Sequence, residues 1–253
     1  MNEVIRTFMN HRSIRSFKNE AIKDKDLDTI IRAAQAAPSS INGQQVSIIA
    51  VKDIERKAKI AEFAGGQKWI EEAPVFLVFA SDFYRAKLAA EKNGVDLGIT
   101  EDIESIIVGC VDVGLAMGNA IGAAESLGLG IVPIGSVRNN PKKLIELLEL
   151  PKYVFPICGL CLGYPNDRSG LKPRLPKEAV YHEEKYNSNL SDIIDRYDEE
   201  MSKYMRERTN GKNDRNWSQG IAQAYKANFF SNVGPTLREQ GYENKNWVMY
   251  KLF

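Results

Sequence analysis

Apolar residues follow two kinds of pattern along this chain. Spacing near 3.6 residues predicts three early helices, over residues 2–10, 24–38 and 53–66. Asp24 and Asp53 are predicted to be helix N-caps, because a carboxylate there accepts hydrogen bonds from free backbone amides. Short apolar runs predict strands in VSIIAV (46–51), PVFLVFA (74–80), GIVPIG (130–135) and VFPICGLCLGYP (154–165). The first two thirds of the chain therefore alternate helices and strands.

The longest helical pattern, 101–127, contains four glycines, which are Gly109, Gly114, Gly118 and Gly122. Glycine costs about 1 kcal/mol in a helix interior, so its repeated use indicates close approach of another helix or backbone. The segment is apolar, but Asp112 interrupts it and leaves runs shorter than the roughly 18 residues of a membrane span. We expect a buried helix at the centre of the fold or of a dimer interface, and no membrane association.

The C-terminal part of the chain has a different character. Residues 164–187 are rich in proline and charge, and the spacing over 190–204 predicts another amphipathic helix. The polar loop RTNGKNDRN follows at 208–216, before a helix that begins near Trp217. We find no internal repeat or clear domain boundary, and expect one domain over 1–253 with a C-terminal helical excursion over 188–253.

Composition excludes some partners. The 34 basic and 33 acidic residues give a net charge of +1, so no overall field attracts nucleic acid or an anionic membrane. The three cysteines, Cys110, Cys158 and Cys161, lie in mostly apolar surroundings, and no basic and apolar leader precedes the first helix. These features indicate a reducing, cytoplasmic location.

Several common chemistries lack their motifs. The chain has no phosphate-binding G-x-x-x-x-G-K-[ST] loop, no complete G-x-G-x-x-G fingerprint and no G-x-S-x-G nucleophile elbow. Cys158 and Cys161 form a C-x-x-C pair without a second pair, and His11 and His182 are the only histidines. Core cysteines are therefore favoured over a zinc or redox site, and no metal is expected.

Five polar clusters remain, each at the end of a predicted element. They are Arg12, Ser13 and Arg15; Ser39, Ser40, Asn42 and Gln44; Gln67 after two glycines; Gly135 and Ser136; and Lys172 and Arg174 between prolines. Taken singly, each has an ordinary interpretation as a surface pair or a loop. Together they supply cations for a phosphate and polar groups for a heterocycle, but no catalytic acid or base, which suits a site where a cofactor carries the chemistry.

The motifs that hold these clusters resemble one known family. They are HRSIRSF, APSSINGQQ, GGQKWI, AAESLGLGIVPIGSVRNNP, FPICGLCLGYP, LKPRLP and RTNGKNDRNWS. Their order resembles that of the FMN-dependent nitroreductase superfamily, in the larger, NADPH-preferring type that includes oxygen-insensitive nitroreductases and flavin reductase P. The resemblance implies an α+β fold with a mostly antiparallel sheet wrapped by helices, in an interlocked homodimer with two FMN molecules at the interface. Helix 101–127 would then be the interface helix, and 188–253 would embrace the partner subunit.

The resemblance also assigns the cofactor-binding residues. It implies that His11, Arg12, Ser13 and Arg15 form the first wall of the FMN site, with Arg15, Lys172 and Arg174 near the phosphate. Gln67 and the backbone of Ile134, Gly135 and Ser136 would contact the isoalloxazine ring, and Ser39, Ser40 and Gln44 would come from the other subunit. Arg208, assisted by Lys212 and Arg215, would bind the 2′-phosphate of NADPH. The family often has glycine in place of Ser136 and varies over 41–43.

The activity implied by the resemblance is ping-pong hydride transfer. NADPH, or NADH, would reduce bound FMN, and a small aromatic acceptor would then take the electrons. Nitroaromatics, quinones, azo dyes and free FMN are all candidate acceptors, because a flat open pocket discriminates poorly. Two alternatives stay open, namely a dedicated FMN reductase that supplies reduced flavin to a partner, and a protein that binds or senses FMN without turnover.

Overall fold

A computed structural model describes residues 1–167 and 169–243. The chain divides into two compact units, one made of Met1–Ser169 with Phe230–Phe253 and the other of Gly170–Phe229. The second unit shares residues 188–229 with the expected excursion over 188–253, and it begins earlier, at Gly170.

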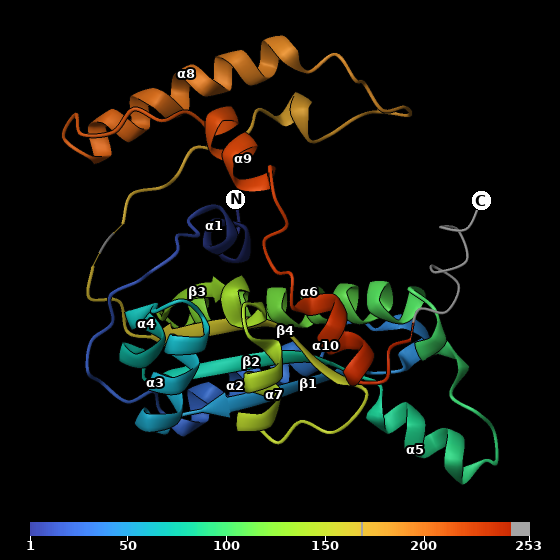
Figure 1. Cartoon of the computed structure of the whole chain (residues 1–253). Helices are drawn as coiled ribbons and strands as arrows, with labels where there is room; N and C mark the ends of the chain where they lie inside the picture. The colour runs from blue at the N-terminus through green and yellow to red at the C-terminus, as the bar shows by residue number, and fades with distance from the viewer. Residues whose placement is uncertain (168, 244–253) are drawn as a thin grey trace. The chain divides into compact units, whose positions relative to one another are not determined.

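The first unit is built on a four-stranded sheet in the order β1-β2-β4-β3 (Figure 1). The strands are β1 (Val46–Val51), β2 (Val75–Asp82), β3 (Gly130–Ile134) and β4 (Val154–Gly163). Every neighbouring pair is antiparallel, and all residues of the central strand β2 are buried, as its continuous apolar run predicts. The expected α+β class with an antiparallel sheet is confirmed.

Helices α2 (Asp24–Gln35) and α6 (Glu104–Ser126) cover one face of this sheet. Their residues Ile30 and Val113 belong to the same buried cluster as Leu77 of β2. The 3.6-residue spacing of apolar positions puts these side chains on one side of each helix.

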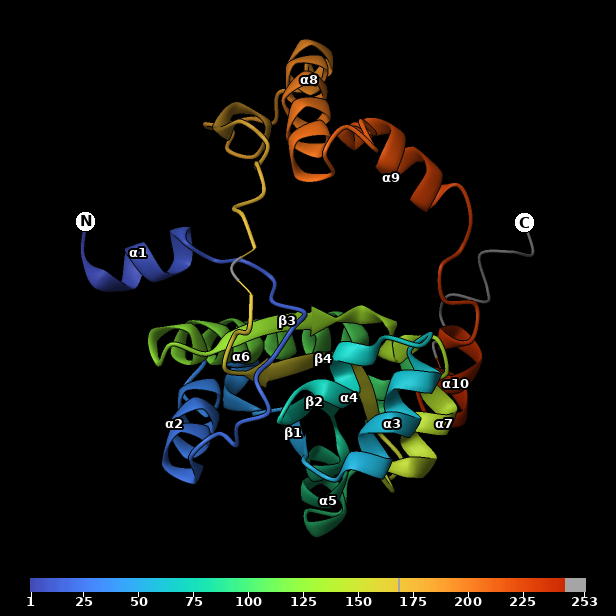
Figure 2. The same ribbon diagram turned by 90° about the vertical axis from the view of Figure 1, so that its left-hand side faces the viewer.

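Helices α3 (Ile54–Phe63), α4 (Lys68–Glu72) and α7 (Pro141–Leu147) cover the opposite face, as Figure 2 shows. Ile60 of α3 packs in one cluster with Phe76 of β2. Successive side chains of a strand point to opposite faces, so neighbouring residues of β2 reach different clusters.

The remaining elements of the first unit are α1 (Glu3–Met9), α5 (Tyr84–Lys92), α10 (Val233–Glu239) and the 3₁₀ turns η1 (Ser40–Asn42), η2 (Gly98–Glu101) and η3 (Gly135–Arg138). The second unit contains η4 (Lys177–Ala179), α8 (Ser191–Arg208) and α9 (Trp217–Tyr225). Within the first unit, the chain after α10 is anchored by the fully buried Tyr242, whose hydroxyl donates to the Tyr153 carbonyl at 2.8 Å.

The two predicted N-caps have different outcomes. The Asp53 carboxylate accepts from the Arg56 amide at 2.8 Å and caps α3, as predicted. The prediction for Asp24 was wrong: Lys23 is the N-cap of α2, and the Asp24 carboxylate instead accepts from Lys52 Nζ at 3.0 Å.

Within this chain, helix α6 is buried along one face, and its other face is exposed. Its exposed face carries apolar side chains, with Ile107 51% and Val111 55% exposed. Within the described residues, α6 is the helix with the length and composition of a membrane span. Its buried face includes Asp112, only 3% exposed.

The glycines of α6 separate into two kinds. A Cβ atom on Gly109 would collide with Ser81, and one on Gly122 would collide with the Phe8 ring. These two positions confirm that close packing requires glycine. Gly114 and Gly118 have nothing within 4 Å of their Cβ positions and lie on the exposed face.

Candidate functional site

The HRSIRSF segment is attached to the edge of the sheet. Ser13 forms a parallel bridge with Ile131 of β3, and the Ile14 amide donates to the Ile131 carbonyl at 2.9 Å. Ile14 is buried, and its side chain occupies the space that a Cβ on Gly130 would need. The segment 11–15 therefore runs beside β3, the strand that leads into the Gly135-Ser136 cluster.

The Gln67 cluster reaches the same end of β3. Gln67 is the N-cap of α4, and its Nε2 donates to Ser136 Oγ at 2.6 Å and to the Ala64 carbonyl at 3.3 Å. Gly65 and Gly66 precede it with φ of 85° and 79°, the left-handed backbone that glycine adopts freely. β3 ends at 134, so Ser136 lies in the turn η3 and not at the end of the strand as predicted.

Arg15 lies over an aromatic ring at this site. Its Cζ is 5.8 Å from the centre of the Trp69 ring, and its side chain is exposed. Trp69 Nε1 is buried and has no hydrogen-bond partner. A buried hydrogen-bond donor without an acceptor is uncommon in a protein. A ligand bound against this ring could supply the missing acceptor.

Arg12 has a different environment, although it is only three residues away in sequence. Its guanidinium group donates to the carbonyls of Asn10 and Ser169, both at 3.3 Å. It also lines a cavity of about 450 Å³ together with Arg6 and Glu125. The structure therefore pairs Arg15 with Trp69, while it ties Arg12 to the main chain.

His11 is paired with a carboxylate that the sequence analysis did not identify. His11 Nδ1 lies 2.7 Å from Glu125 Oε1 near the end of α6. The second oxygen, Glu125 Oε2, is buried without a partner. No local motif indicated this pair, because the two residues are far apart in sequence.

The PSSINGQQ cluster lies in another part of the first unit. Ser39 and Gln44 line a cavity of about 480 Å³ with Arg85 of α5 and Asp112 of α6. Within one chain, this cavity does not include Gln67, Ser136 or Arg15. A role for this loop in the same site therefore requires a second copy of the chain.

Three of the assigned cations belong to the second unit, Lys172, Arg174 and Arg208, and all are exposed. The Pro173 carbonyl between the first two accepts from the Tyr197 hydroxyl at 2.9 Å. Burial raises the pKa of Tyr197, and the positive charge of Arg174 partly opposes this rise.

Arg208 is the last residue of α8, and not part of the following loop as predicted. The loop itself is held by hydrogen bonds, since the Thr209 hydroxyl accepts from the Asn213 amide at 2.9 Å. Arg215 donates to two carbonyls of α9, both at 3.2 Å, whereas the side chain of Lys212 is exposed.

The buried cysteine and lysine near the sheet have altered proton affinities. Burial raises the pKa of Cys161, which lies in the core cluster beneath α3 and α4. Burial also lowers the pKa of Lys57, whose Nζ donates to the carbonyls of Glu71 at 3.0 Å and Ala73 at 2.5 Å. The three cysteines are free, and the described residues contain no group of three or more potential metal ligands among His, Cys, Asp and Glu.

Comparison with known proteins identifies the sequence family. The model of the nitroreductase family matches residues 8–164, and the model of the C-terminal domain of the nitroreductase family matches residues 172–245. The first match alone covers more than half of the chain.

Curated relatives and solved structures match over most of the chain. An FMN reductase [NAD(P)H] of Bacillus subtilis is 57% identical over 246 residues, covering 96% of this chain and 99% of the relative. An oxygen-insensitive NADPH nitroreductase of Salmonella typhimurium is 40% identical over 221 residues, covering 87% and 90%. The solved structure of B. megaterium NfrA2 is 55% identical and superimposes with a TM-score of 0.95, covering 96% of this chain and 99% of that one.

Proposed function

Because the chain belongs to the nitroreductase family, we propose that it is an NAD(P)H-dependent oxidoreductase that binds FMN beside Arg15, Gln67 and Ser136. The observation that carries this assignment is the meeting of three distant segments at the end of β3. The Ser13 bridge brings in the first segment, and the Gln67 hydrogen bond to Ser136 joins the other two. The family and the activity are shared with relatives whose lengths match that of this chain.

The groups at this site fit FMN. Arg15 offers an exposed, permanently charged fork for a phosphate, and Lys172 and Arg174 are assigned to the same phosphate by the resemblance. The unpartnered Trp69 Nε1 is a further donor, and Gln67 with the backbone of 134–136 supplies polar groups for the ring. When bound, FMN supplies the hydride-transfer chemistry; these residues hold and orient it and stabilise negative charge at its pyrimidine edge.

We propose a homodimer formed through the exposed face of α6. That face combines apolar side chains at Ile107 and Val111 with open positions at Gly114 and Gly118, where a second helix could approach closely. In this arrangement Ser39, Ser40 and Gln44 are contributed to the partner's FMN site. The second unit, with α8 and α9, is proposed to embrace the partner subunit.

Arg208 is proposed to bind the 2′-phosphate of NADPH. It is an exposed cation at the end of α8, next to a loop whose conformation is fixed by the Thr209 and Asn213 hydrogen bonds. A guanidinium group at this position can distinguish NADPH from NADH because only NADPH carries that phosphate. The proposed location is the cytoplasm, where three free cysteines stay reduced.

The acceptor is a small aromatic molecule, such as a nitroaromatic or a quinone, or free FMN. A dedicated FMN reductase that supplies reduced flavin is the second candidate, since the 57% identical relative is named an FMN reductase. Comparing kcat/KM for free FMN with that for a nitroaromatic and a quinone distinguishes these two functions. A strong preference for free FMN assigns the reductase role.

Two measurements test the proposed function. Titration of the apoprotein with FMN measures binding, and initial rates at several NADPH and acceptor concentrations measure the kinetic order. We expect saturable FMN binding and parallel double-reciprocal lines, because each substrate uses the site in turn. Intersecting lines, or a protein that binds no FMN, would contradict the proposal.

A further inference from the structure

The loop between α2 and β1 has an unusual backbone. Three of its non-glycine residues have a left-handed backbone conformation, with φ of 47° at Ile41, 58° at Asn42 and 53° at Gln44. The left-handed region is strongly unfavourable for a β-branched residue such as Ile41. The residue is 96% exposed, so packing of its side chain within this chain does not impose the conformation. Such backbone persists only where the surrounding structure enforces it.

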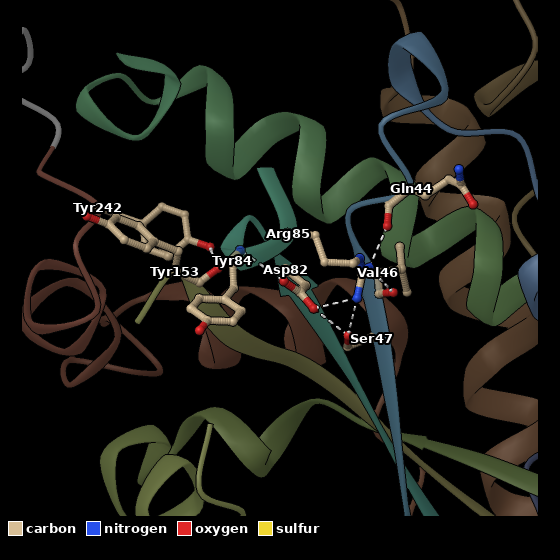
Figure 3. Close-up of polar contacts among 8 residues, drawn as sticks. All are labelled: Gln44, Val46, Ser47, Asp82, Tyr84, Arg85, Tyr153 and Tyr242. Atoms are coloured by element: carbon tan, nitrogen blue, oxygen red, sulfur yellow. Dashed lines mark hydrogen bonds and ion pairs between the residues drawn. The ribbon is translucent and has the colours of Figure 1, made fainter. Parts of the chain in front are cut away.

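The C-terminal end of this loop is held by Arg85 of α5. Arg85 Nη2 donates to the carbonyls of Gln44 at 2.6 Å and Val46 at 2.8 Å, as Figure 3 shows. Its Nη1 donates to Ser47 Oγ at 3.0 Å and to Asp82 Oδ2 at 2.8 Å. One planar guanidinium group thus connects the end of the loop and the start of β1 to the end of β2.

Asp82 keeps this guanidinium group in place. Its side chain is 7% exposed, and it accepts from the Tyr84 amide at 2.9 Å and from Ser47 Oγ at 2.5 Å (Figure 3). A buried carboxylate with several donors has one favourable orientation, so Arg85 is anchored to the sheet and not only to its own helix.

The N-terminal end of the loop is held by a second buried carboxylate. Asp112 of α6 accepts from the Ser40 amide, with its two oxygens at 3.2 and 3.3 Å. Inside the loop, Ser39 Oγ accepts from the Gln44 amide at 3.1 Å. Both ends of the loop are therefore fixed by charged groups on neighbouring helices.

We infer that Arg85 is a positioning residue for the flavin site of the partner subunit, because its guanidinium fork holds the loop in the conformation that presents Ser39, Ser40 and Gln44. This inference rests on the proposed function. Lysine cannot replace this arginine, since an ammonium group lacks the planar fork that reaches two carbonyls, a hydroxyl and a carboxylate together.

The local part of the inference is tested without any flavin. Hydrogen exchange of the apoprotein measures the protection of amides 40–46 in Arg85→Gln, Arg85→Lys and a control. The control is Lys87→Gln, which removes a cation of the same helix whose ion pair with Glu91 lies outside the loop. Both Arg85 variants should lose protection in this loop and the control should keep it. Unchanged protection in the Arg85 variants would overturn the inference.

The effect on the cofactor is measured next. FMN binding should weaken about tenfold or more in both Arg85 variants, since charge-assisted hydrogen bonds that fix the loop are lost. Adding Ile41→Asn should restore part of the affinity, because asparagine tolerates left-handed backbone. Arg85→Lys keeps a charge beside Asp82, so wild-type affinity in this variant would overturn the positioning role.

Mixed dimers test whether Arg85 acts across the interface. Chains with Arg85→Gln and chains with Arg15→Gln are co-expressed with different tags, and the mixed dimer is purified. One of its two sites then combines an intact Arg15 with a loop supported by Arg85, so we expect that site to bind FMN with wild-type affinity. Loss of affinity at both sites would overturn the inference. If the wild-type protein itself binds no FMN, the proposed function fails instead, and the exchange result still reports on the loop.

Discussion

Gln67 Nε2 donates to Ser136 Oγ across 2.6 Å and joins the start of α4 to the turn that follows β3. The two residues come from clusters separated by 69 positions in the chain. Their contact fixes one edge of the proposed flavin site, since both residues sit where the Arg15 segment runs along β3.

Replacing Ser136 by glycine removes the acceptor of this hydrogen bond. Gln67 then loses a hydrogen bond of about 1 kcal/mol that orients its side chain, so the FMN dissociation constant should rise by at most roughly fivefold. Fluorescence titration measures the change. Ser126→Ala, which removes an exposed hydroxyl bonded within α6, is the control and should bind like wild type. Equal FMN affinities for Ser136→Gly and the control would show that the Ser136 side chain does not contribute to the site.

Arg15→Gln should weaken FMN binding more strongly. A hydrogen bond to a charged group is worth about 1.5–3 kcal/mol, which corresponds to a loss of roughly 10- to 100-fold in affinity. Arg32→Gln is the control, because Arg32 is an exposed arginine paired with Asp28 on α2. If Arg15→Gln retains FMN as firmly as the control does, Arg15 is not a phosphate ligand.

Arg208→Ala should affect NADPH and NADH differently. Loss of a charge-assisted contact to the 2′-phosphate should raise the KM for NADPH about tenfold or more and leave the KM for NADH nearly unchanged. Arg206→Ala is the matched control, since Arg206 lies on the same helix and donates to Ser202. Equal changes for both nucleotides would refute the 2′-phosphate assignment.

Val111→Asp should separate the proposed homodimer. Burying an unpaired carboxylate in an apolar interface costs several kcal/mol, so the mass measured by sedimentation should fall to that of one chain, and FMN affinity should fall with it. Ile54→Asp replaces a side chain of similar exposure on α3, which covers the other face of the sheet. An unchanged mass for Val111→Asp would place the interface elsewhere.

Above pH 9, the free energy of unfolding should depend on the ionisation of the Cys161 thiol. Burial raises the pKa of this thiol above its usual 9.0, so the unfolded chain loses the proton first and the free energy of unfolding falls as pH rises. Lys57 makes a contribution of the opposite sign. Its pKa is lowered from 10.5 in the folded protein, so unfolding binds a proton and this contribution to the free energy of unfolding rises with pH. Urea denaturation from pH 8 to 10.5 should therefore show a shallower fall in Cys161→Ala and a steeper fall in Lys57→Met.

The sheet could be predicted from the sequence because its strands are continuous apolar runs. Strand β1 has the predicted bounds, and the other three differ by a few residues. The short helices α4, α5, α7 and α10 were not predicted. Segments of five to nine residues carry too little periodicity, and packing against the sheet stabilises them.

The site could be predicted only where its residues form local motifs. Gln67 and Ser136 each stand in a recognisable cluster, so both could be proposed as site residues from the sequence, and the structure joins them by a hydrogen bond. Glu125 and Arg85 were missed because their partners lie far away in sequence, and Asp112 was noticed only as an interruption of an apolar helix. The left-handed backbone around Ile41 is opposed by its residue type, so only tertiary contacts can impose it.

Both proposed half-reactions can be followed in the absorbance spectrum of the FMN-loaded protein under anaerobic conditions. We predict that NADPH bleaches the flavin band and that subsequent addition of a quinone or nitroaromatic restores it, which establishes both half-reactions in turn. A yellow protein that NADPH cannot bleach would contradict the enzymatic assignment and favour a protein that only binds FMN. A protein that FMN cannot colour would contradict the site itself.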